Sequence, residues 1–510
     1  MTGSRTQNAE RNIVFAFLNK MVSLVLPFVT RTIVIYVLGA QVLGLNNLFT
    51  SVLSFLSLAE LGLGTAIVHS MYKPIAEDDK TTICALLAYY RSLYRIIGMT
   101  ILIIGTLLLP FLPHLIRGSA PEGINIYIVF YIYLLNTVLS YFLVGYKQCL
   151  LAAHQRSDIT SKISIVANFV MRIAQIVILC IVQDYYVYAF LPIISTVTIN
   201  VLNALITNKM YPEYKAEGKL EKKIINEIKK KISGLIGTKI NAVVVHSADA
   251  LVVSAFLGLT DSAKYSNYYY IINMLSGIIM TFHSSMTAGV GNSIVTENLD
   301  KNYKLFKKLS FINSWVVGWC CVCLVCLLQP FMTLWMGERM TYPRMVEVCF
   351  VIYFFVYNIQ RVVLMFKDAA GLWYEDRMRP YVAMIINVVL NITLVNVIGV
   401  YGIILSSVVA FCISVPWANY TLFTYLFDKP AWKNIWSMFK DGILTSIVSA
   451  LTYIICRLFP DGFFFILVRV IICAFVPNII FYLFYRRCEE FSDMCALLYD
   501  RILKRFIQRK

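Results

Sequence analysis

The chain consists of long apolar segments separated by short polar ones. Apolar runs of about 18 to 25 residues recur throughout the sequence, and each is long enough to cross a hydrocarbon core of roughly 30 Å as a helix. About fourteen such runs are present. The predicted helices span residues 13–38, 45–69, 92–113, 125–146, 161–182, 188–208, 233–257, 265–290, 309–330, 345–367, 380–398, 403–427, 442–459 and 463–486. This pattern predicts an all-α integral membrane protein.

Two basic segments lie outside the apolar runs. Residues 209–232 place isoleucines on one helical side and lysines on the other, and residues 487–510 repeat this arrangement. Such a pattern is typical of a helix that lies in the membrane interface. The predicted organisation is therefore an N-terminal lobe (1–208), a basic amphipathic cytoplasmic linker (209–232), a C-terminal lobe (233–427), an extra helix pair (428–486) and a basic amphipathic cytoplasmic tail (487–510).

The two predicted lobes share a weak repeat. Val37-Leu38-Gly39 followed by Asn47 parallels Phe256-Leu257-Gly258 followed by Asn267. Parallel repeats in transporters place the substrate path between the two halves. The repeat predicts two pseudo-symmetric six-helix lobes, and chance similarity between apolar segments is the alternative.

Composition supports the membrane class, and the position of the charges gives its orientation. Of 510 residues, 59% are hydrophobic and 14% charged, with 45 Lys and Arg against 28 Asp and Glu, a net charge of +17. The basic residues crowd alternate loops, most densely at Lys209, Lys215, Lys219, Lys222, Lys223, Lys229, Lys230 and Lys231. This positive-inside bias predicts that both termini are cytoplasmic. It also favours anionic lipid head groups as partners of the linker and tail, and it argues against nucleic acid.

Cysteine is frequent, with thirteen residues, and most of them lie inside apolar runs. The cluster Cys320, Cys321, Cys323 and Cys326 lies mid-helix with no His or carboxylate nearby. A C-x-x-C spacing is the pattern of a metal or redox site. We favour the other interpretation, in which cysteine is a small apolar residue of a packed helix, and expect no metal and no cofactor.

Charged residues inside the predicted helices are the best functional candidates. A charge at the bilayer centre costs about 2.5 to 3.5 kcal/mol, so it persists mainly where it faces a wet cavity or a partner. Lys20 and Arg31 are eleven residues apart, which leaves them only about 20° apart around the helix. We predict both as substrate-binding residues, although Lys20 is close enough to the cytoplasmic end to snorkel to the interface.

Arg172 lies near the middle of the fifth predicted helix. Asn168 and Gln175 fall within about 60° of it on the same face. We predict that all three residues face a cavity and bind substrate, with a buried structural ion pair of Arg172 as the alternative.

Three further ionisable residues are candidates for ion coupling or gating. His246 and Asp249 are three residues apart on the seventh predicted helix, so they are neighbours there and could exchange protons. The alternative is that Asp249 pairs with Arg31 or Arg172. Glu60, on the second predicted helix, is the third candidate, and placement at the interface is its alternative.

Other polar residues in the helices have simpler explanations. The run Tyr265, Tyr268, Tyr269 and Tyr270 could stack on sugars, but we favour an aromatic belt at the membrane interface. Asn387 and Asn391, one turn apart, would bond either sugars or a neighbouring helix.

The sequence argues against an enzyme. It contains no G-x-x-x-x-G-K-[ST] phosphate loop, so we expect no ATP hydrolysis of the P-loop type. The loops are too short to fold as a catalytic domain. We therefore predict no catalytic residues.

Several short motifs together resemble the polysaccharide transport family of the multidrug/oligosaccharidyl-lipid/polysaccharide exporter superfamily, often called Wzx-type flippases. The motifs that carry the resemblance are Arg11-Asn12, Val37-Leu38-Gly39 with Leu43-Gly44-Leu45, Leu61-Gly62-Leu63-Gly64 with Thr65-Ala66, and Asp249 with Phe256-Leu257-Gly258 and Tyr265-Ser266-Asn267. The resemblance covers the whole chain. It implies two pseudo-symmetric bundles, a cationic central cavity and export of undecaprenyl-diphosphate-linked sugar repeats across a bacterial cytoplasmic membrane, with polysaccharide polymerases and glycosyltransferases as partners.

The physical chemistry of the candidate residues agrees with that implication. Guanidinium groups match the paired oxygens of a diphosphate bidentately, which suits Arg31 and Arg172. Rocking of one lobe against the other would expose the cavity to alternate sides of the membrane. The alternatives are a cation-coupled multidrug exporter of the same superfamily and an integral-membrane polysaccharide polymerase or acyltransferase.

Overall fold

The computed structural model of the chain describes all residues except 1–22, 24, 61, 461, 489 and 493–510. The described part is helical and contains no strand. Its elements are the helix Val25–Leu38, α2 (Ala40–Leu56), η1 (Ser57–Glu60), α3 (Leu63–Ala76), α4 (Lys80–Leu108), η2 (Leu109–Leu115), α5 (Ile126–Phe142), η3 (Gly145–Lys147), α6 (Gln148–Ala153), α7 (Ser157–Ile181), α8 (Tyr185–Met210), α9 (Lys222–Phe256), α10 (Leu259–Thr296), α11 (Leu299–Met336), η4 (Glu338–Met340), α12 (Arg344–Ile359), α13 (Arg361–Ala369), α14 (Arg379–Ile398), α15 (Val400–Leu422), η5 (Phe423–Phe427), α16 (Trp432–Arg457) and α17 (Phe463–Tyr485).

The predicted all-α membrane class is confirmed. Within the described residues, nine helices are long and apolar enough to cross a membrane, or ten if the bent pair α5 and η3–α6 forms one span. Shorter apolar helices occur at Val25–Leu38, Ala40–Leu56 and Val243–Phe256.

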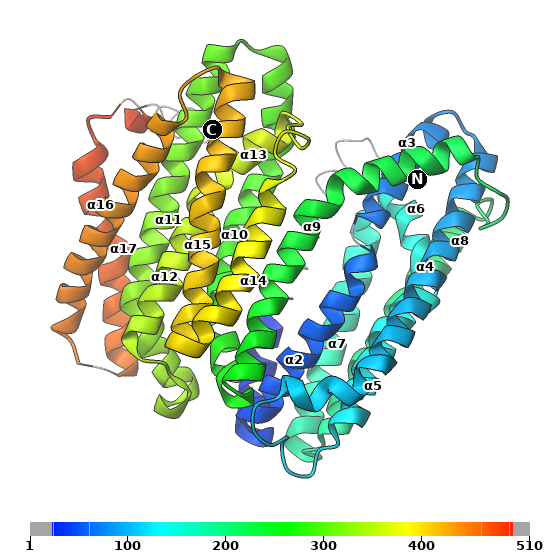
Figure 1. The fold of residues 1–510 in the computed structure, drawn as a ribbon, viewed down its shortest axis with the longest axis horizontal. Coiled ribbons are helices and arrows are strands. Elements are labelled where there is room, and N and C mark those ends of the chain that lie inside the picture. Colours follow the sequence, from blue (N-terminus) through cyan, green and yellow to red (C-terminus); the bar gives the residue numbers. More distant parts are fainter. Residues whose placement is uncertain (1–22, 24, 61, 461, 489, 493–510) are drawn as a thin grey trace, which may run out of the picture. The chain divides into compact units, whose positions relative to one another are not determined.

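The chain forms two compact units (Figure 1). Unit 1 comprises Met1–Ser266 and unit 2 comprises Asn267–Lys510. The division falls inside α10, whereas the sequence pattern puts the boundary between lobes at the linker 209–232. The lobe boundaries and their pseudo-symmetry stay predictions.

The second predicted helix, 45–69, is wrong as a continuous helix. It is interrupted by the 3-10 turn η1, and α3 begins afresh at Leu63. Gly62 has φ 85° and ψ −12°, a left-handed conformation that glycine adopts without the steric cost a side chain would bring. The break leaves Glu60 in a turn rather than on a helical face.

The linker is partly continuous with the helix that follows it. The sequence pattern predicts an interfacial segment 209–232 and a separate helix 233–257, but α9 runs from Lys222 to Phe256 (Figure 1). Ile228 in its first part is fully buried. Placement of the linker at a membrane interface stays a prediction.

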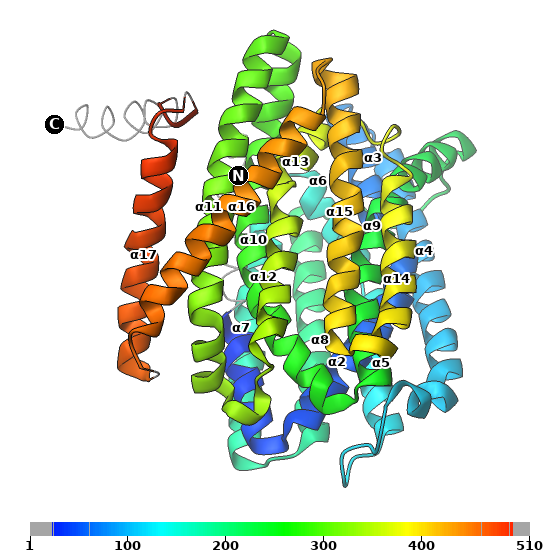
Figure 2. The same ribbon diagram turned by 60° about the vertical axis from the view of Figure 1, so that its left-hand side comes forward.

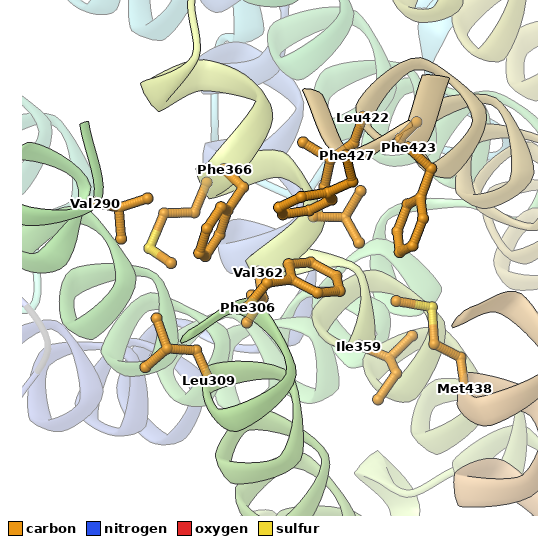
Figure 3. Close-up of a cluster of buried hydrophobic side chains, with 13 residues drawn as sticks. Val290, Phe306, Leu309, Ile359, Val362, Phe366, Leu422, Phe423, Phe427 and Met438 are labelled. Atoms are coloured by element: carbon orange, nitrogen blue, oxygen red, sulfur yellow. The ribbon is translucent and has the colours of Figure 1, made fainter. Parts of the chain in front are cut away.

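Aromatic packing forms one core of unit 2 (Figure 3). The Phe306 ring of α11 lies 5.3 Å from the ring of Phe366, 5.5 Å from that of Phe423 and 5.3 Å from that of Phe427, measured between ring centroids. Edge-to-face and tilted arrangements of this kind stabilise a core beyond simple burial of area. The cluster joins α11, α13, α15 and η5.

A second core of unit 2 joins α16 and α17 to α11, and Figure 2 shows the three helices together. Val322, Cys326, Val448, Cys473 and Phe481 are buried in it. The extra C-terminal pair predicted from the sequence therefore packs on α11.

Amide and hydroxyl groups tie α14 to α15. Asn387 donates to the hydroxyl of Ser407 at 2.9 Å, and Ser406 donates to Asn391 at 2.5 Å. Both asparagines are fully buried. Asn387 and Asn391 therefore bond a neighbouring helix, which is one of the two roles predicted for them.

Candidate functional site

Arg31 is anchored by a serine hydroxyl of α10. Its Nη2 donates to Ser266 Oγ at 2.6 Å, and Asn47 Nδ2 of α2 donates to the same oxygen at 2.6 Å. The Ser266 hydroxyl in turn donates to the carbonyl of Ala263 at 2.9 Å. This hydroxyl therefore fixes the half-buried Arg31 guanidinium against two other helices of unit 1.

Arg172 is held within its own helix. Its Nη1 donates to Gln175 Oε1 at 3.0 Å, and Gln175 Nε2 donates to the carbonyl of Tyr188 on α8 at 3.3 Å. Gln175 is 1% exposed, whereas Arg172 and Asn168 are half-buried. Arg172 and Gln175 therefore lie on the same side of α7, as predicted, and form a hydrogen bond with each other.

Both arginines act electrostatically on one tyrosine. The Tyr188 side chain is within electrostatic reach of Arg172 and of Arg31. Tyr133 of α5 is also within reach of Arg172. Unit 1 therefore contains two guanidinium groups, on different helices, whose charges both reach Tyr188.

Asn46 joins the surrounding helices. Its side-chain oxygen accepts hydrogen bonds from Tyr133 at 2.6 Å and from Tyr185. The three residues connect α2, α5 and α8 with polar contacts, which are favourable inside a helical bundle because each removes an unsatisfied group.

Glu60 is held by two tyrosines. Tyr94 of α4 donates to one carboxylate oxygen at 2.7 Å and Tyr141 of α5 donates to the other at 2.6 Å. Tyr90 donates to the Tyr94 hydroxyl at 2.7 Å and extends the chain. These bonds fix the Glu60 side chain in position.

Glu60 lines a cavity of about 550 Å³ in unit 1. The walls come from α2, η1, α3, α5 and α9, and they are rich in hydroxyl and amide groups, with Thr50, Ser54, Ser57, Thr65, Asn136 and Thr137. Such groups donate to and accept from sugar hydroxyls equally well. Arg31 and Arg172 do not belong to the lining.

Asp249 of α9 is 2% exposed and accepts a hydrogen bond from Tyr265 at 3.0 Å. The predicted pairing of Asp249 with Arg31 or Arg172 stays a prediction. Lys20 and the side chain of His246 lie outside the part of the chain that the structure describes, so the predicted proton exchange between His246 and Asp249 also stays a prediction.

Tyrosine and serine hydroxyls are the partners that the sequence pattern missed. The predicted interfacial belt is wrong for Tyr265 and Tyr268, which are 5% and 0% exposed, because each hydroxyl has a partner inside the protein. Tyr268 donates to Gln329 at 2.9 Å within unit 2. A tyrosine among polar helical positions is the signal that indicates such a bond.

Comparison with solved structures identifies the fold. The lipid II flippase MurJ in an inward closed conformation matches with a TM-score of 0.64 at 15% identity, covering 93% of this chain and 98% of that one. An inward-facing multidrug resistance MATE transporter of the MOP superfamily matches with a TM-score of 0.56 at 15% identity, covering 83% and 96%. A MOP superfamily transporter from Pyrococcus furiosus matches with a TM-score of 0.52 at 15% identity, covering 82% and 96%. The chain therefore shares its fold with these membrane proteins.

The family follows from the sequence match. The family model described as "Polysaccharide biosynthesis protein" matches residues 9–288, more than half of the chain. The chain belongs to this family. A comparison with curated protein sequences finds no match.

Proposed function

We propose that the protein is a flippase that exports undecaprenyl-diphosphate-linked oligosaccharide repeat units across a bacterial cytoplasmic membrane, for the biosynthesis of surface polysaccharides. The observation that carries the proposal is the pair Arg31 and Arg172, held near one tyrosine in the same unit as a hydroxyl-lined cavity. Membership of the polysaccharide biosynthesis family supports a sugar substrate. The same fold in a lipid II flippase supports a lipid-linked one.

The charge of the substrate explains the choice of arginine. A diphosphate presents paired oxygens that a guanidinium group binds bidentately, so Arg31 and Arg172, with Lys20, would bind the head group. Asn168 and Gln175 would bind neighbouring oxygens through their amides. Transport would proceed by alternating access through a cationic cavity.

The three acidic or titratable candidates have a separate role in this proposal. Glu60, Asp249 and His246 would couple an ion or gate the path. Glu60 is supported by its place in the cavity wall. A role for Asp249 is supported by its burial. A carboxylate inside the membrane is costly unless it pairs with another group or binds a transported ion.

The proposal includes a setting for the protein. Both termini would face the cytoplasm, with the linker 209–232 and the tail 487–510 on anionic lipid head groups. Glycosyltransferases would supply the substrate and a polysaccharide polymerase would consume it. Reporter fusions at each terminus would test the orientation, because a cytoplasmic terminus keeps an attached reporter inside the cell.

A cation-coupled multidrug exporter is the second candidate. It is favoured by one observation, namely that Glu60 lines the unit 1 cavity while neither arginine does. An acidic wall attracts a cationic drug and repels a diphosphate.

Proteoliposomes distinguish the two candidates. The protein is reconstituted and offered either a fluorescent undecaprenyl-diphosphate oligosaccharide or a cationic dye, with protein-free vesicles as the control. The flippase proposal expects protein-dependent transfer of the lipid-linked sugar alone. Transfer of the dye without the sugar lipid would favour the exporter.

A further inference from the structure

Three cysteine side chains meet in the interior of unit 2 although they come from three helices. Cys326 lies in α11, Cys456 in α16 and Cys473 in α17. Their Sγ atoms all lie within 4.8 Å of one another, and each residue is at most 2% exposed. All three are free thiols. The three cysteines meet because α11, α16 and α17 pack together, and their spacing in the sequence does not predict this contact.

A fourth thiol adjoins the group. Cys323 lies one turn before Cys326 on α11, so the two share a helical side. The Cys473 thiol is close enough to interact with the thiols of Cys323, Cys326 and Cys456. Cys323 also packs against the core that contains the other three. Cys473 is therefore the centre of a cluster of four sulfur atoms.

We propose that Cys326, Cys456 and Cys473, with Cys323 beside them, bind one soft metal ion, either Zn(II) or Cu(I). Thiolate ligands select these ions over hard cations. A metal–sulfur distance of about 2.3 Å places neighbouring sulfur atoms about 3.8 to 4.0 Å apart in tetrahedral or trigonal geometry. The observed limit of 4.8 Å exceeds these distances by about 1 Å or less, a gap that small rotations of the side chains would close.

The surroundings compensate the charge that binding creates. Each thiol that coordinates the metal releases its proton, so three thiolates around Zn(II), or two around Cu(I), carry a net charge of −1. A buried charge needs a partner of opposite sign. Arg469 is 7% exposed and lies within electrostatic reach of Cys456. Its positive charge brings the site to neutrality.

A cavity adjoins the site. A cavity of about 420 Å³ in unit 2 has Cys326 and Cys456 in its lining, together with Arg344 and Arg469. In this proposal, metal enters and the released protons leave through this cavity. The Arg344 guanidinium lies 3.8 Å from the centre of the Tyr453 ring, which keeps that side of the cavity polar.

A packing role alone explains less. Cysteine is a small apolar residue that fills gaps in a core, and Val322, Leu444 and Val448 form the same core by packing alone. That role makes no demand on the distance between sulfur atoms. Bound metal would instead tie α16 and α17 to α11, so it would raise the thermal stability of the loaded protein.

The test measures metal on the full-length protein in detergent. The parent, Cys473→Ser and Cys412→Ser are stripped of metal under reducing conditions and loaded with Zn(II) in one arm and Cu(I) in the other. The control position Cys412 is exposed on α15 and outside the cluster. With the metal that the site binds, the parent and the control should each retain about one ion per chain. Cys473→Ser should retain at least roughly tenfold less of that metal.

Two measurements on the parent alone guard against a variant that fails to fold. Bound metal should protect Cys326, Cys456 and Cys473 from alkylation, and X-ray absorption should give a shell of sulfur at about 2.3 Å. The proposal is overturned if neither metal protects these thiols, if Cys473→Ser binds as the parent does, or if mass spectrometry of the freshly purified protein finds two of the three joined as a disulfide.

Discussion

At the scale of single residues, neutral side chains position the charged groups of unit 1. Gln175 accepts from Arg172 and Ser266 accepts from Arg31, while two tyrosines donate to Glu60. A hydrogen bond from or to a neutral group orients a charge without cancelling it. Gln175 and Ser266 therefore fix the orientation of the two guanidinium groups.

The start of α4 gives a residue-scale prediction about pH. The Asp79 carboxylate accepts from the Thr81 hydroxyl at 2.6 Å and from the Thr82 N–H at 3.0 Å, and chiefly the bond from Thr81 lowers the pKa of Asp79 to about 2. Because the folded pKa lies below the unfolded value of about 3.9, the stabilisation is complete above about pH 4 and is lost as the pH falls towards 2.

Hydrogen exchange at the first amides of α4 measures this effect. Asp79→Ala should speed their exchange at neutral pH, because the cap is lost. Asp79→Asn keeps a capping oxygen and should stay close to the parent at neutral pH, without the loss of protection in acid. Equal exchange rates in the parent and Asp79→Ala would contradict the capping role.

Sequence reasoning identified charged candidates but not their partners. Arg31, Arg172, Glu60 and Asp249 stand out because a charge in an apolar run is costly. The serine and tyrosine that hold Arg31 and Asp249 are separated from them in sequence, by 235 residues between Arg31 and Ser266 and by 16 between Asp249 and Tyr265. Such contacts depend on how helices pack, which hydrophobic periodicity does not encode.

At the scale of helices, close approach of two backbones explains the glycine at position 44. A Cβ on Gly44 of α2 would lie 2.0 Å from the carbonyl oxygen of Leu259 and 2.7 Å from its carbon. Backbone atoms cannot move aside as a flexible side chain can, so only glycine fits where α2 meets the start of α10. Most helix positions were foreseen from apolar length, but the break at Gly62 depends on backbone dihedrals that an apolar run conceals.

Gly44→Ala should therefore destabilise unit 1. Overpacking of a close contact costs about 1 to 3 kcal/mol, and thermal unfolding in detergent should show a lower midpoint for the variant. Gly289→Ala is the matched control, because Gly289 is exposed in α10 with nothing within 4 Å of an added Cβ. Alanine also has the higher helix propensity, so the control should equal or exceed the parent. An unchanged unfolding midpoint for Gly44→Ala would contradict the close contact between α2 and the start of α10.

At the scale of the whole molecule, the proposed export of a lipid-linked sugar needs a source of energy. The sequence contains no G-x-x-x-x-G-K-[ST] loop for binding a nucleotide. A diphosphate carries negative charge, and moving one negative charge out of a negative cytoplasm through about 100 mV gains roughly 2.3 kcal/mol. We therefore propose that the membrane potential assists export.

A potassium diffusion potential in proteoliposomes tests this idea. A potential of about 100 mV, negative inside, should shift the equilibrium of the lipid-linked sugar outward about 50-fold for each charge moved. Proton and sodium gradients without a potential are the matched controls. Control of transfer by either gradient, with no effect of the potential, would contradict the proposal and favour ion coupling.

The most direct test of the central claim is transfer of a fluorescent undecaprenyl-diphosphate oligosaccharide by proteoliposomes containing the parent, the double variant Arg31→Ala/Arg172→Ala, or Arg95→Ala, whose arginine is exposed on α4. We predict transfer by the parent and the control. The double variant should transfer at least about tenfold more slowly, because a hydrogen bond to a charged group contributes about 1.5 to 3 kcal/mol. Equal transfer by the double variant would refute the cationic site, and no transfer by the folded parent would refute the flippase.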